Sequence, residues 1–271
     1  PLDFHDFGPA LRFPRQAQFH PLKYLAQLAE AVQRRGGRIY AHTRAANLEG
    51  GERVHVETAG GAVIAADALV VATNTPISHH LAIHTKQAAY RTYVVGARVP
   101  ANSVPTLLLW DTLDHYHYVR VQRDVDGRDI LIVGGEDHKT GQADDFDKRY
   151  ARLEAWTRQR FPMVEGFEFH WSGQVLEPVD YLAFIGQNPG DDDNIYVVTG
   201  DSGNGMTHGT IAGILLTDLI CGHRNPWTAL YDPSRITVKA AAEFAKENLN
   251  VAARFVEYAT VYGHYYGTDR G

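Results

Sequence analysis

Apolar residues recur at helical spacing near the start of the chain and at strand spacing over much of the rest. In "HPLKYLAQLAEAVQRRGG" they fall three or four positions apart, with Pro21 at the beginning and Gly36-Gly37 at the end. This pattern predicts a helix over about residues 21–35. The segments that follow predict a short strand over 38–43 and a hairpin formed by 53–58 and 62–67. The continuous apolar run over 68–74 predicts a strand buried on both faces.

The middle of the chain has a different pattern, with strand-like segments that no crossover helix separates. These segments are 90–99, 106–111, 116–122 and 130–137. Their spacing predicts an antiparallel sheet, which a helix over 143–161 and a strand over 167–179 follow. Beyond them the pattern predicts a buried strand over 194–200 and a glycine-rich turn over 200–205. Two helices are predicted after that, over 204–221 and 234–257. The predicted fold class is therefore α/β, with a domain formed by 1–80 and 181–271 and interrupted by an antiparallel α+β domain, 81–180.

Composition narrows the class of protein without naming a function. The 271 residues carry a formal net charge of −6, and no block of five like charges occurs, which argues against a nucleic-acid partner. Cys221 is the single cysteine, so no intrachain disulfide can form and a reducing, cytoplasmic compartment is expected. No apolar run is long enough to span a membrane, and no signal peptide is visible. Because the chain begins at Pro1 rather than Met, we expect a piece of a longer protein.

The turn between residues 200 and 205 combines three glycines with the start of a helix. Glycine allows the backbone to approach a ligand closely, and helix-start amides favour negative charge. The spacing is G-x-x-G-x-G rather than the dinucleotide fingerprint G-x-G-x-x-G, and no acidic strand end follows about 20 residues later. The turn therefore fits a polar heterocycle or a carboxylate better than a pyrophosphate. A tight strand–helix connection without any ligand is the alternative.

Candidate catalytic residues lie in the antiparallel segment. His138 ends a strand and titrates in the range where it can act on an amine or a carboxylate, although it can equally be a solvated loop histidine. In "HYHYVR", alternation puts Tyr118 and Arg120 on one face, as an aromatic wall with a cation for a carboxylate. Arg91 lies in a similar cluster with two tyrosines, and either group can be ordinary sheet surface. The two histidines of "HYHYVR" lack a third ligand, so no metal site is expected.

Three segments together resemble the D-amino-acid oxidase family of flavoproteins, in its glycine- and sarcosine-oxidase-like branch. They are "FHPLKYLAQLAEAVQRRGGRIYAHTRA", "ADALVVATN" and "WSGQVLEPVDYLAFIGQNPGDDDNIYVVTGDSGNGMTHG". The resemblance covers nearly the whole chain and implies FAD held in an incomplete Rossmann-like domain, with the antiparallel domain facing substrate. The family's first strand and its G-x-G-x-x-G would precede Pro1.

By the same resemblance, backbone groups near three segments would contact FAD: Thr43, Arg44 and Ala45 by the adenine, then Ala72, Thr73 and Asn74, and finally Gly203, Asn204, Gly205, Met206 and Thr207 by the isoalloxazine. His138 matches an active-site histidine through H-x-x-G-Q. The sequence also resembles a subgroup in which a Rieske iron–sulfur domain follows. None of that domain's Cys and His ligands is in this chain. If the full-length protein has a Rieske domain, that domain is a candidate electron acceptor.

The resemblance implies an FAD-dependent oxidoreductase that oxidises a C–N bond of an amine or amino acid by hydride transfer. Two alternatives stay open at this stage. One is a truncated or non-catalytic product of the same fold that binds a ligand or partner without FAD. The other is a nucleotide-binding protein that uses the glycine turn directly, against which the glycine spacing counts.

Overall fold

The computed structural model describes residues 8–77, 83–123 and 127–235, and these form two compact units. One unit comprises Pro1–His42 and Tyr90–Gln174, and the other comprises Thr43–Ala89 and Val175–Gly271. The fold is mixed α/β, as the sequence predicts. The unit boundaries near 90 and 174 differ from the expected 81 and 180, and residues before 43 group with the antiparallel unit instead of the other one. The helix predicted over 234–257 lies almost entirely outside the described residues.

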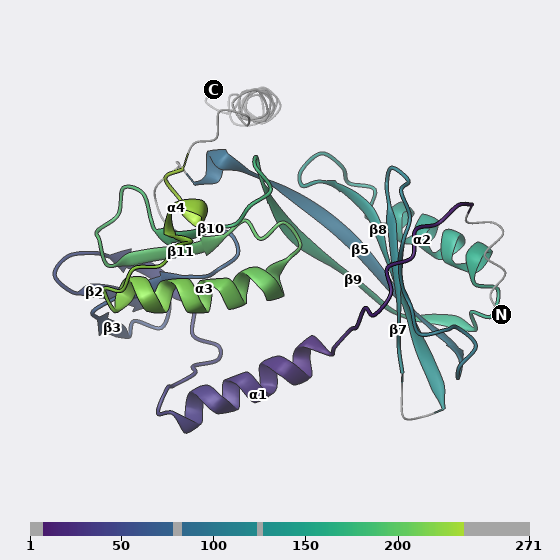
Figure 1. Ribbon diagram of the computed structural model, residues 1–271, viewed down its shortest axis with the longest axis horizontal. Coiled ribbons are helices and arrows are strands. Elements are labelled where there is room, and N and C mark those ends of the chain that lie inside the picture. The colour runs from purple at the N-terminus through teal and green to yellow at the C-terminus, as the bar shows by residue number, and fades with distance from the viewer. Residues whose placement is uncertain (1–7, 78–82, 124–126, 236–271) are drawn as a thin grey trace, which may run out of the picture. The chain divides into compact units, whose positions relative to one another are not determined.

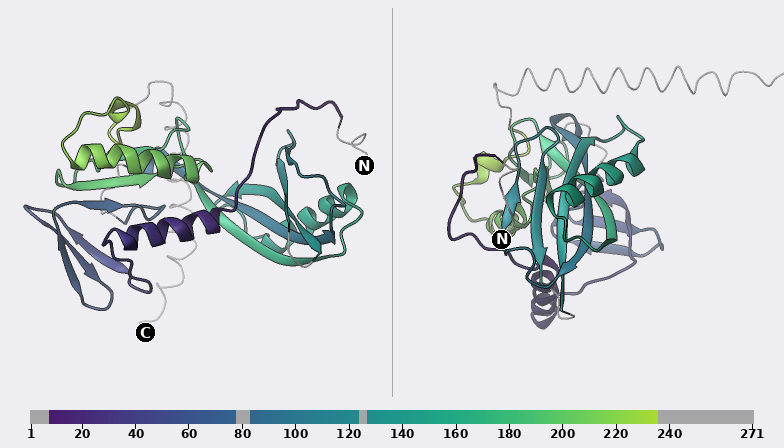
Figure 2. Two further views of the ribbon diagram at one scale, coloured as in Figure 1. Left: turned by 60° about the horizontal axis from the view of Figure 1, so that its bottom comes forward. Right: turned by 90° about the vertical axis from the view of Figure 1, so that its right-hand side faces the viewer.

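A five-stranded sheet, in the order β6-β7-β8-β5-β9, forms the first unit (Figure 1). Its strands are β5 (Gln87–Pro100), β6 (Leu108–Trp110), β7 (His117–Gln122), β8 (Arg128–Lys139) and β9 (Gly166–Pro178). β8 pairs antiparallel with both β5 and β7, which confirms the predicted antiparallel sheet. Figure 2 shows helix α2 (Phe146–Arg160) lying along one face of this sheet.

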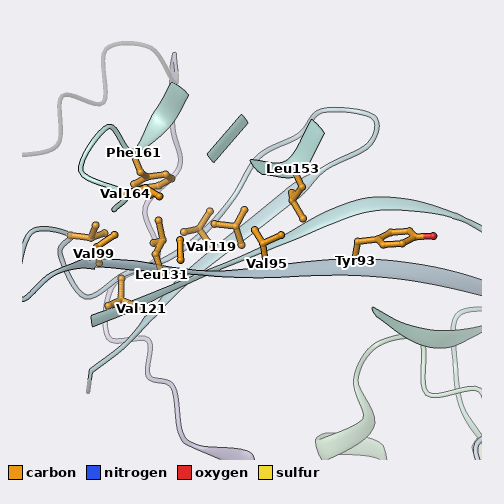
Figure 3. Packing of buried hydrophobic residues seen from close by; sticks show 12 residues of the cluster. Tyr93, Val95, Val99, Val119, Val121, Leu131, Leu153, Phe161 and Val164 are labelled. Atoms are coloured by element: carbon orange, nitrogen blue, oxygen red, sulfur yellow. The ribbon is translucent and has the colours of Figure 1, made fainter. Parts of the chain in front are cut away.

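Alternate residues of β5, β7 and β8 bury their side chains between the sheet and α2 (Figure 3). Val95, Val119, Leu131 and Leu153 are at most 2% exposed. Successive strand residues point to opposite faces, so the intervening residues of these strands lie on the face away from α2. We call that side the open face.

A β-bulge interrupts the alternation near the end of β8. Arg91 pairs with His138 and Tyr93 pairs with Gly135, so two residues of β8, Glu136 and Asp137, lie opposite one residue of β5. Glu136 takes the left-handed conformation with φ of 58°. Because one residue is extra, the side chains beyond it point to the opposite face from the one that strict alternation gives.

The second unit contains two small sheets. One has the order β1-β2-β3, from β1 (Ala45–Glu49), β2 (Val54–Thr58) and β3 (Val63–Ala66), and includes the predicted hairpin. The other has the order β10-β11-β4, from β10 (Phe184–Gln187), β11 (Ile195–Thr199) and β4 (Leu69–Val71). β11 runs parallel to β4 and antiparallel to β10. Helix α3 (Gly205–Ile220) packs beside β10 and β11, with the short α4 (Thr228–Tyr231) against β10 (Figure 1).

The strand predictions over 38–43 and 68–74 need correction. Residues 38–43 form no strand, and the strand in that region, β1, begins at Ala45. A strand needs a hydrogen-bonded neighbour, and the ladder partner in this sheet, β2, pairs from Ala45 onward. β4 is also less enclosed than predicted, because Val71 is buried while Val70 is 39% exposed.

Helix α1 (Pro21–Arg34) confirms the first helix that the sequence predicts. Pro21 occupies its first turn, where a missing N–H costs nothing, and the His20 side chain accepts a hydrogen bond from the Lys23 N–H. No residue of α1 is buried, and Leu22 is 70% exposed. The apolar stripe that predicts the helix is therefore not part of either core.

Candidate functional site

Two loops meet where parallel strands β4 and β11 end. Residues 72–74 follow β4 and the turn beginning at Gly200 follows β11. The Thr199 hydroxyl donates a hydrogen bond to the Asn74 carbonyl at 2.6 Å, and the Gln87 amide donates to the same hydroxyl at 3.2 Å. These bonds tie the two loops together. Ligands of open α/β sheets bind in the crevice outside the carboxyl ends of parallel strands, which is where these loops lie.

The glycine turn has a defined shape because its backbone is bonded to β9 on one side. The Ser202 N–H donates to the Leu176 carbonyl at 3.1 Å, and the Ser202 hydroxyl donates to the Glu177 carboxylate at 2.6 Å. Gly200 has φ of 69°, and a Cβ there would lie 2.6 Å from Cγ of Pro178. A side chain at Gly200 would therefore push the turn off β9.

The start of α3 leaves space and free donors for a ligand. The first helical N–H groups, those of Gly205, Met206 and Thr207, have no acceptor within the helix. The side chain of Asn204 makes no capping hydrogen bond and instead donates to the Ser202 carbonyl. A Cβ added at Gly203 would meet nothing within 4 Å.

The same absence of neighbours extends along α3. A Cβ at Gly209 or Gly213 would also meet no atom of the described chain within 4 Å. The Asp201 carboxylate occupies the place that a Cβ of Gly205 would take, so its charge lies beside the helix start. The residues fit a planar, polar group that accepts hydrogen bonds from the α3 amides, which is the chemistry of a flavin's pyrimidine edge.

The structure brings two of the three predicted cofactor segments together. Residues 72–74 follow β4, and residues 203–207 belong to the turn and helix that follow its parallel neighbour β11. Thr43, Arg44 and Ala45 lie instead at the start of β1, in the other sheet, where the Arg44 carbonyl accepts a hydrogen bond from the Ala59 N–H at 2.8 Å. Their place beside an adenine stays a prediction.

His138 lies on the α2 side of the antiparallel sheet and is 9% exposed. Its Nδ1 is 2.9 Å from the Lys139 carbonyl, which only accepts, so Nδ1 carries a hydrogen. Its Nε2 is 2.9 Å from the Tyr93 hydroxyl, which donates to it when the imidazole is neutral. Burial raises the pKa of Tyr93, so that hydroxyl stays protonated at neutral pH. Both ring nitrogens are therefore engaged, and the predicted catalytic role of His138 stays a prediction.

Arg91 lies close to His138 rather than on the open face. Its guanidinium donates to the Ser172 hydroxyl at 2.8 Å and sits 6.0 Å from the ring centroid of Phe146, the first residue of α2. The structure thus separates the four predicted catalytic residues into two pairs, with His138 and Arg91 toward the first turn of α2 and Tyr118 and Arg120 on the open face.

Tyr118 lies flat on the open face because Gly134 has no side chain. The two residues are paired across β7 and β8, and a Cβ at Gly134 would overlap two ring carbons and the hydroxyl oxygen of Tyr118. The Tyr118 and Thr92 hydroxyls are 3.5 Å apart. Burial raises the pKa of Tyr118, and the nearby guanidinium of Arg120 opposes that rise. Tyr118 and Arg120 thus share the open face, and their role as an aromatic wall with a cation stays a prediction.

Asp137 shares the open face and was not among the predicted residues. The bulge turns it away from α2, and the side chains of Thr92 and Tyr116 form hydrogen bonds with its carboxylate. Its Oδ1 is buried without a hydrogen-bond partner among the described residues. Burial raises the pKa of Asp137 despite those two hydrogen bonds. The signal that could have revealed it is Gly134-Gly135 within a strand, since glycine inside a strand often marks a bulge.

His117 serves the core rather than a metal site. Its ring stacks on Trp156 with centroids 4.2 Å apart, and its Nδ1 is 2.8 Å from the Asp111 carboxylate. The described part of the chain contains no group of three or more potential metal ligands. None of its helices is both long and apolar enough to cross a membrane.

Comparison with known proteins gives a consistent match. Residues 1–219 match the model of a family described as FAD-dependent oxidoreductase (DAO). A Bacillus subtilis (strain 168) protein, YhfW, named for a Rieske 2Fe-2S iron–sulfur centre, is 31% identical over 227 residues, which are 83% of this chain and 44% of that protein. This chain thus spans less than half the length of that curated relative.

Solved structures share the fold. Glycine oxidase from Geobacillus kaustophilus is 20% identical with a TM-score of 0.61, over 78% of this chain and 57% of that one. L-proline dehydrogenase from P. horikoshii is 17% identical with a TM-score of 0.59, over 79% of this chain and 59% of that one. At these identities the likeness establishes the architecture.

Proposed function

Because this chain belongs to the FAD-dependent oxidoreductase family, we propose that it forms part of an enzyme that oxidises a C–N bond of an amine or amino acid. The observation that carries the proposal is the pair of loops at the ends of the parallel strands β4 and β11, joined by the Thr199–Asn74 hydrogen bond, with the start of α3 beside them. FAD, when bound, accepts a hydride from the carbon next to the substrate nitrogen. The resulting imine then takes up water and separates into a carbonyl compound and an amine.

The chain's own groups would contribute binding and charge stabilisation. The N–H groups at the start of α3, with the positive end of the helix dipole, would stabilise negative charge that develops on a ring bound beside them. The bond from Thr199 to the Asn74 carbonyl holds the opposite side of the crevice. On the open face, Tyr118 supplies an aromatic surface and Arg120 supplies a cation for a substrate carboxylate.

In this proposal His138 acts by holding the end of strand β8 in place. Its hydrogen bonds to Tyr93 and to the Lys139 carbonyl fix the end of β8 next to Asp137. We therefore expect His138→Ala to lower turnover far more than it lowers flavin content. Equal turnover in that variant would remove His138 from the proposal.

Oxidation of the substrate would transfer two electrons to FAD, and an electron acceptor must then remove them from the flavin. The relative named for a Rieske 2Fe-2S centre extends well beyond the region matched here. A Rieske domain of the full-length protein is therefore the acceptor that we propose.

The test is spectroscopic and uses the full-length protein. We expect the purified protein to show flavin absorbance, and we expect glycine, sarcosine or L-proline to bleach it when oxygen is absent. A full-length protein without flavin, even after FAD is added, would refute the proposal and support a non-catalytic product of the same fold.

A further inference from the structure

The open face of the antiparallel unit contains an acid that the proposed reaction has not used. Asp137 stands beside Tyr116, Tyr118 and Thr92, with ring centroids of the two tyrosines 6.1 Å apart. All four residues belong to the same compact unit. We propose that Asp137 binds the substrate's amine as a cation, against the rings of Tyr116 and Tyr118, and so makes the site selective for ammonium groups. The proposal deepens the function above and rests on it.

The hydrogen bonds of the Asp137 carboxylate leave one of its oxygens without a partner among the described residues, which supports a ligand there. A buried polar atom without a partner costs free energy, and native proteins rarely retain one without a reason. The carboxylate receives hydrogen bonds from Thr92 and Tyr116, but Oδ1 has none within the described chain. An ammonium group would supply the missing donor together with the missing charge.

The surroundings of Asp137 suit a cation. No lysine or arginine forms an ion pair with it among the described residues, and the side chains of His115 and His138 lie near enough to act on it. The tyrosine rings present faces that attract cations. Arg120 lies two residues further along β7 and, like Asp137, acts electrostatically on Tyr118, so the open face carries groups of both charges.

The bulge gives a second, independent reason. It is formed by Glu136 and Asp137, and it costs backbone strain at Glu136, whose φ is 58°. Its consequence is that Asp137 faces the open side while Glu136 bonds to Arg152 of α2 at 2.8 Å. Bulges often re-aim a side chain next to a binding site. Here the side chain that is re-aimed is the acid.

Calorimetric titration of the full-length protein with sarcosine, glycine and L-proline tests the inference without relying on turnover. We expect Asp137→Asn to weaken binding of these amines by about ten- to a hundred-fold, the usual effect of losing a charge-assisted hydrogen bond. Asp144→Asn is the matched control, because it removes the same charge from an exposed position of the same unit. N-acetylglycine, whose nitrogen carries no charge, should bind equally weakly to all three proteins.

The unfolding midpoint separates a binding role from a structural one. Since Asp137 has an unpartnered oxygen and an unfavourable buried charge, Asp137→Asn should raise the midpoint at pH 7, whereas loss of a structural acid would lower it. Asp137→Ser provides a second neutral variant if the first one folds poorly. Equal amine affinity in wild type and either folded variant would overturn the inference, and so would a wild type that binds none of the three amines. If amines bind in a way that depends on Asp137 but do not bleach the flavin, the proposed oxidation is refuted. The inference about Asp137 is then still supported.

Discussion

Gly134→Ala should displace Tyr118 from the open face. A Cβ at this position would lie well inside van der Waals contact with three atoms of the Tyr118 side chain, Cζ, Cε2 and the hydroxyl oxygen. Normal carbon contacts are about 3.5–4.0 Å, so the ring would have to move by more than about 1 Å. The alternative is that β7 and β8 separate, which would disturb the core beneath them.

The expected cost follows from the overlap. Adding one methyl group to a tightly packed site usually destabilises a protein by about 1–3 kcal/mol. Gly173→Ala is the control, because a Cβ there meets nothing within 4 Å and β9 belongs to the same sheet. It should be neutral or slightly stabilising, since alanine loses less conformational freedom than glycine on folding. Urea unfolding followed by far-ultraviolet circular dichroism measures both.

A double-mutant cycle identifies the cause. In a Tyr118→Ala background the overlap is gone, so Gly134→Ala should cost almost nothing, with a coupling free energy of about 1–3 kcal/mol between the two positions. Additive effects would show that the strain arises elsewhere and would refute this account of why a glycine stands at 134. The amine titration should follow the same pattern, because Tyr118 forms part of the proposed cation site.

Three further predictions concern the second unit. Gly200→Ala should cost more than about 1 kcal/mol in unfolding free energy and should reduce flavin content, because its Cβ would strike Pro178 and its φ is positive. Thr199→Val should also reduce flavin content, measured as the ratio of 450 to 280 nm absorbance, since it releases the 72–74 loop; unchanged content would contradict the bond to Asn74 as a determinant of the crevice. Burial opposes ionisation of Asp180, yet the two hydrogen bonds from Arg235 hold its pKa below the usual value. Asp180→Asn should therefore cost about 3 kcal/mol at pH 7. A depressed pKa contributes stability above the unfolded value and loses it as the pH falls through the folded one, so the cost should shrink below about pH 4 in acid unfolding curves.

Sequence patterns predicted the elements whose signals are local. The helices over 21–35, 143–161 and 204–221 and the hairpin over 53–67 all exist, because periodicity and end signals lie within the segments themselves. The strand expected over 38–43 does not exist. Whether such a segment forms a strand depends on a neighbour that its own sequence does not contain.

The candidate site shows the same limit. The parallel pairing of β4 with β11 brings the loops after these two strands to the same edge of the sheet. The sequence pattern predicted the two strands, whereas the contact of residues 72–74 and 203–207 with a cofactor came from the family resemblance. The bond from Thr199 to Asn74 was not predictable, because it joins side chain and backbone over more than a hundred residues.

The bulge in β8 decides which side chain lies on the open face. Val133 points toward α2, so strict alternation would place Asp137 under α2 and His138 on the open face. The sequence favoured His138 for its chemistry and for its place at the end of a strand. One extra residue, Glu136, reverses the order and gives the open face an acid in place of an imidazole. An acid attracts the cationic form of an amine, whereas an imidazole would exchange its proton. The geometry therefore favours recognition of the ammonium group by the strand, with bond cleavage dependent on the cofactor that the second unit is shaped to hold.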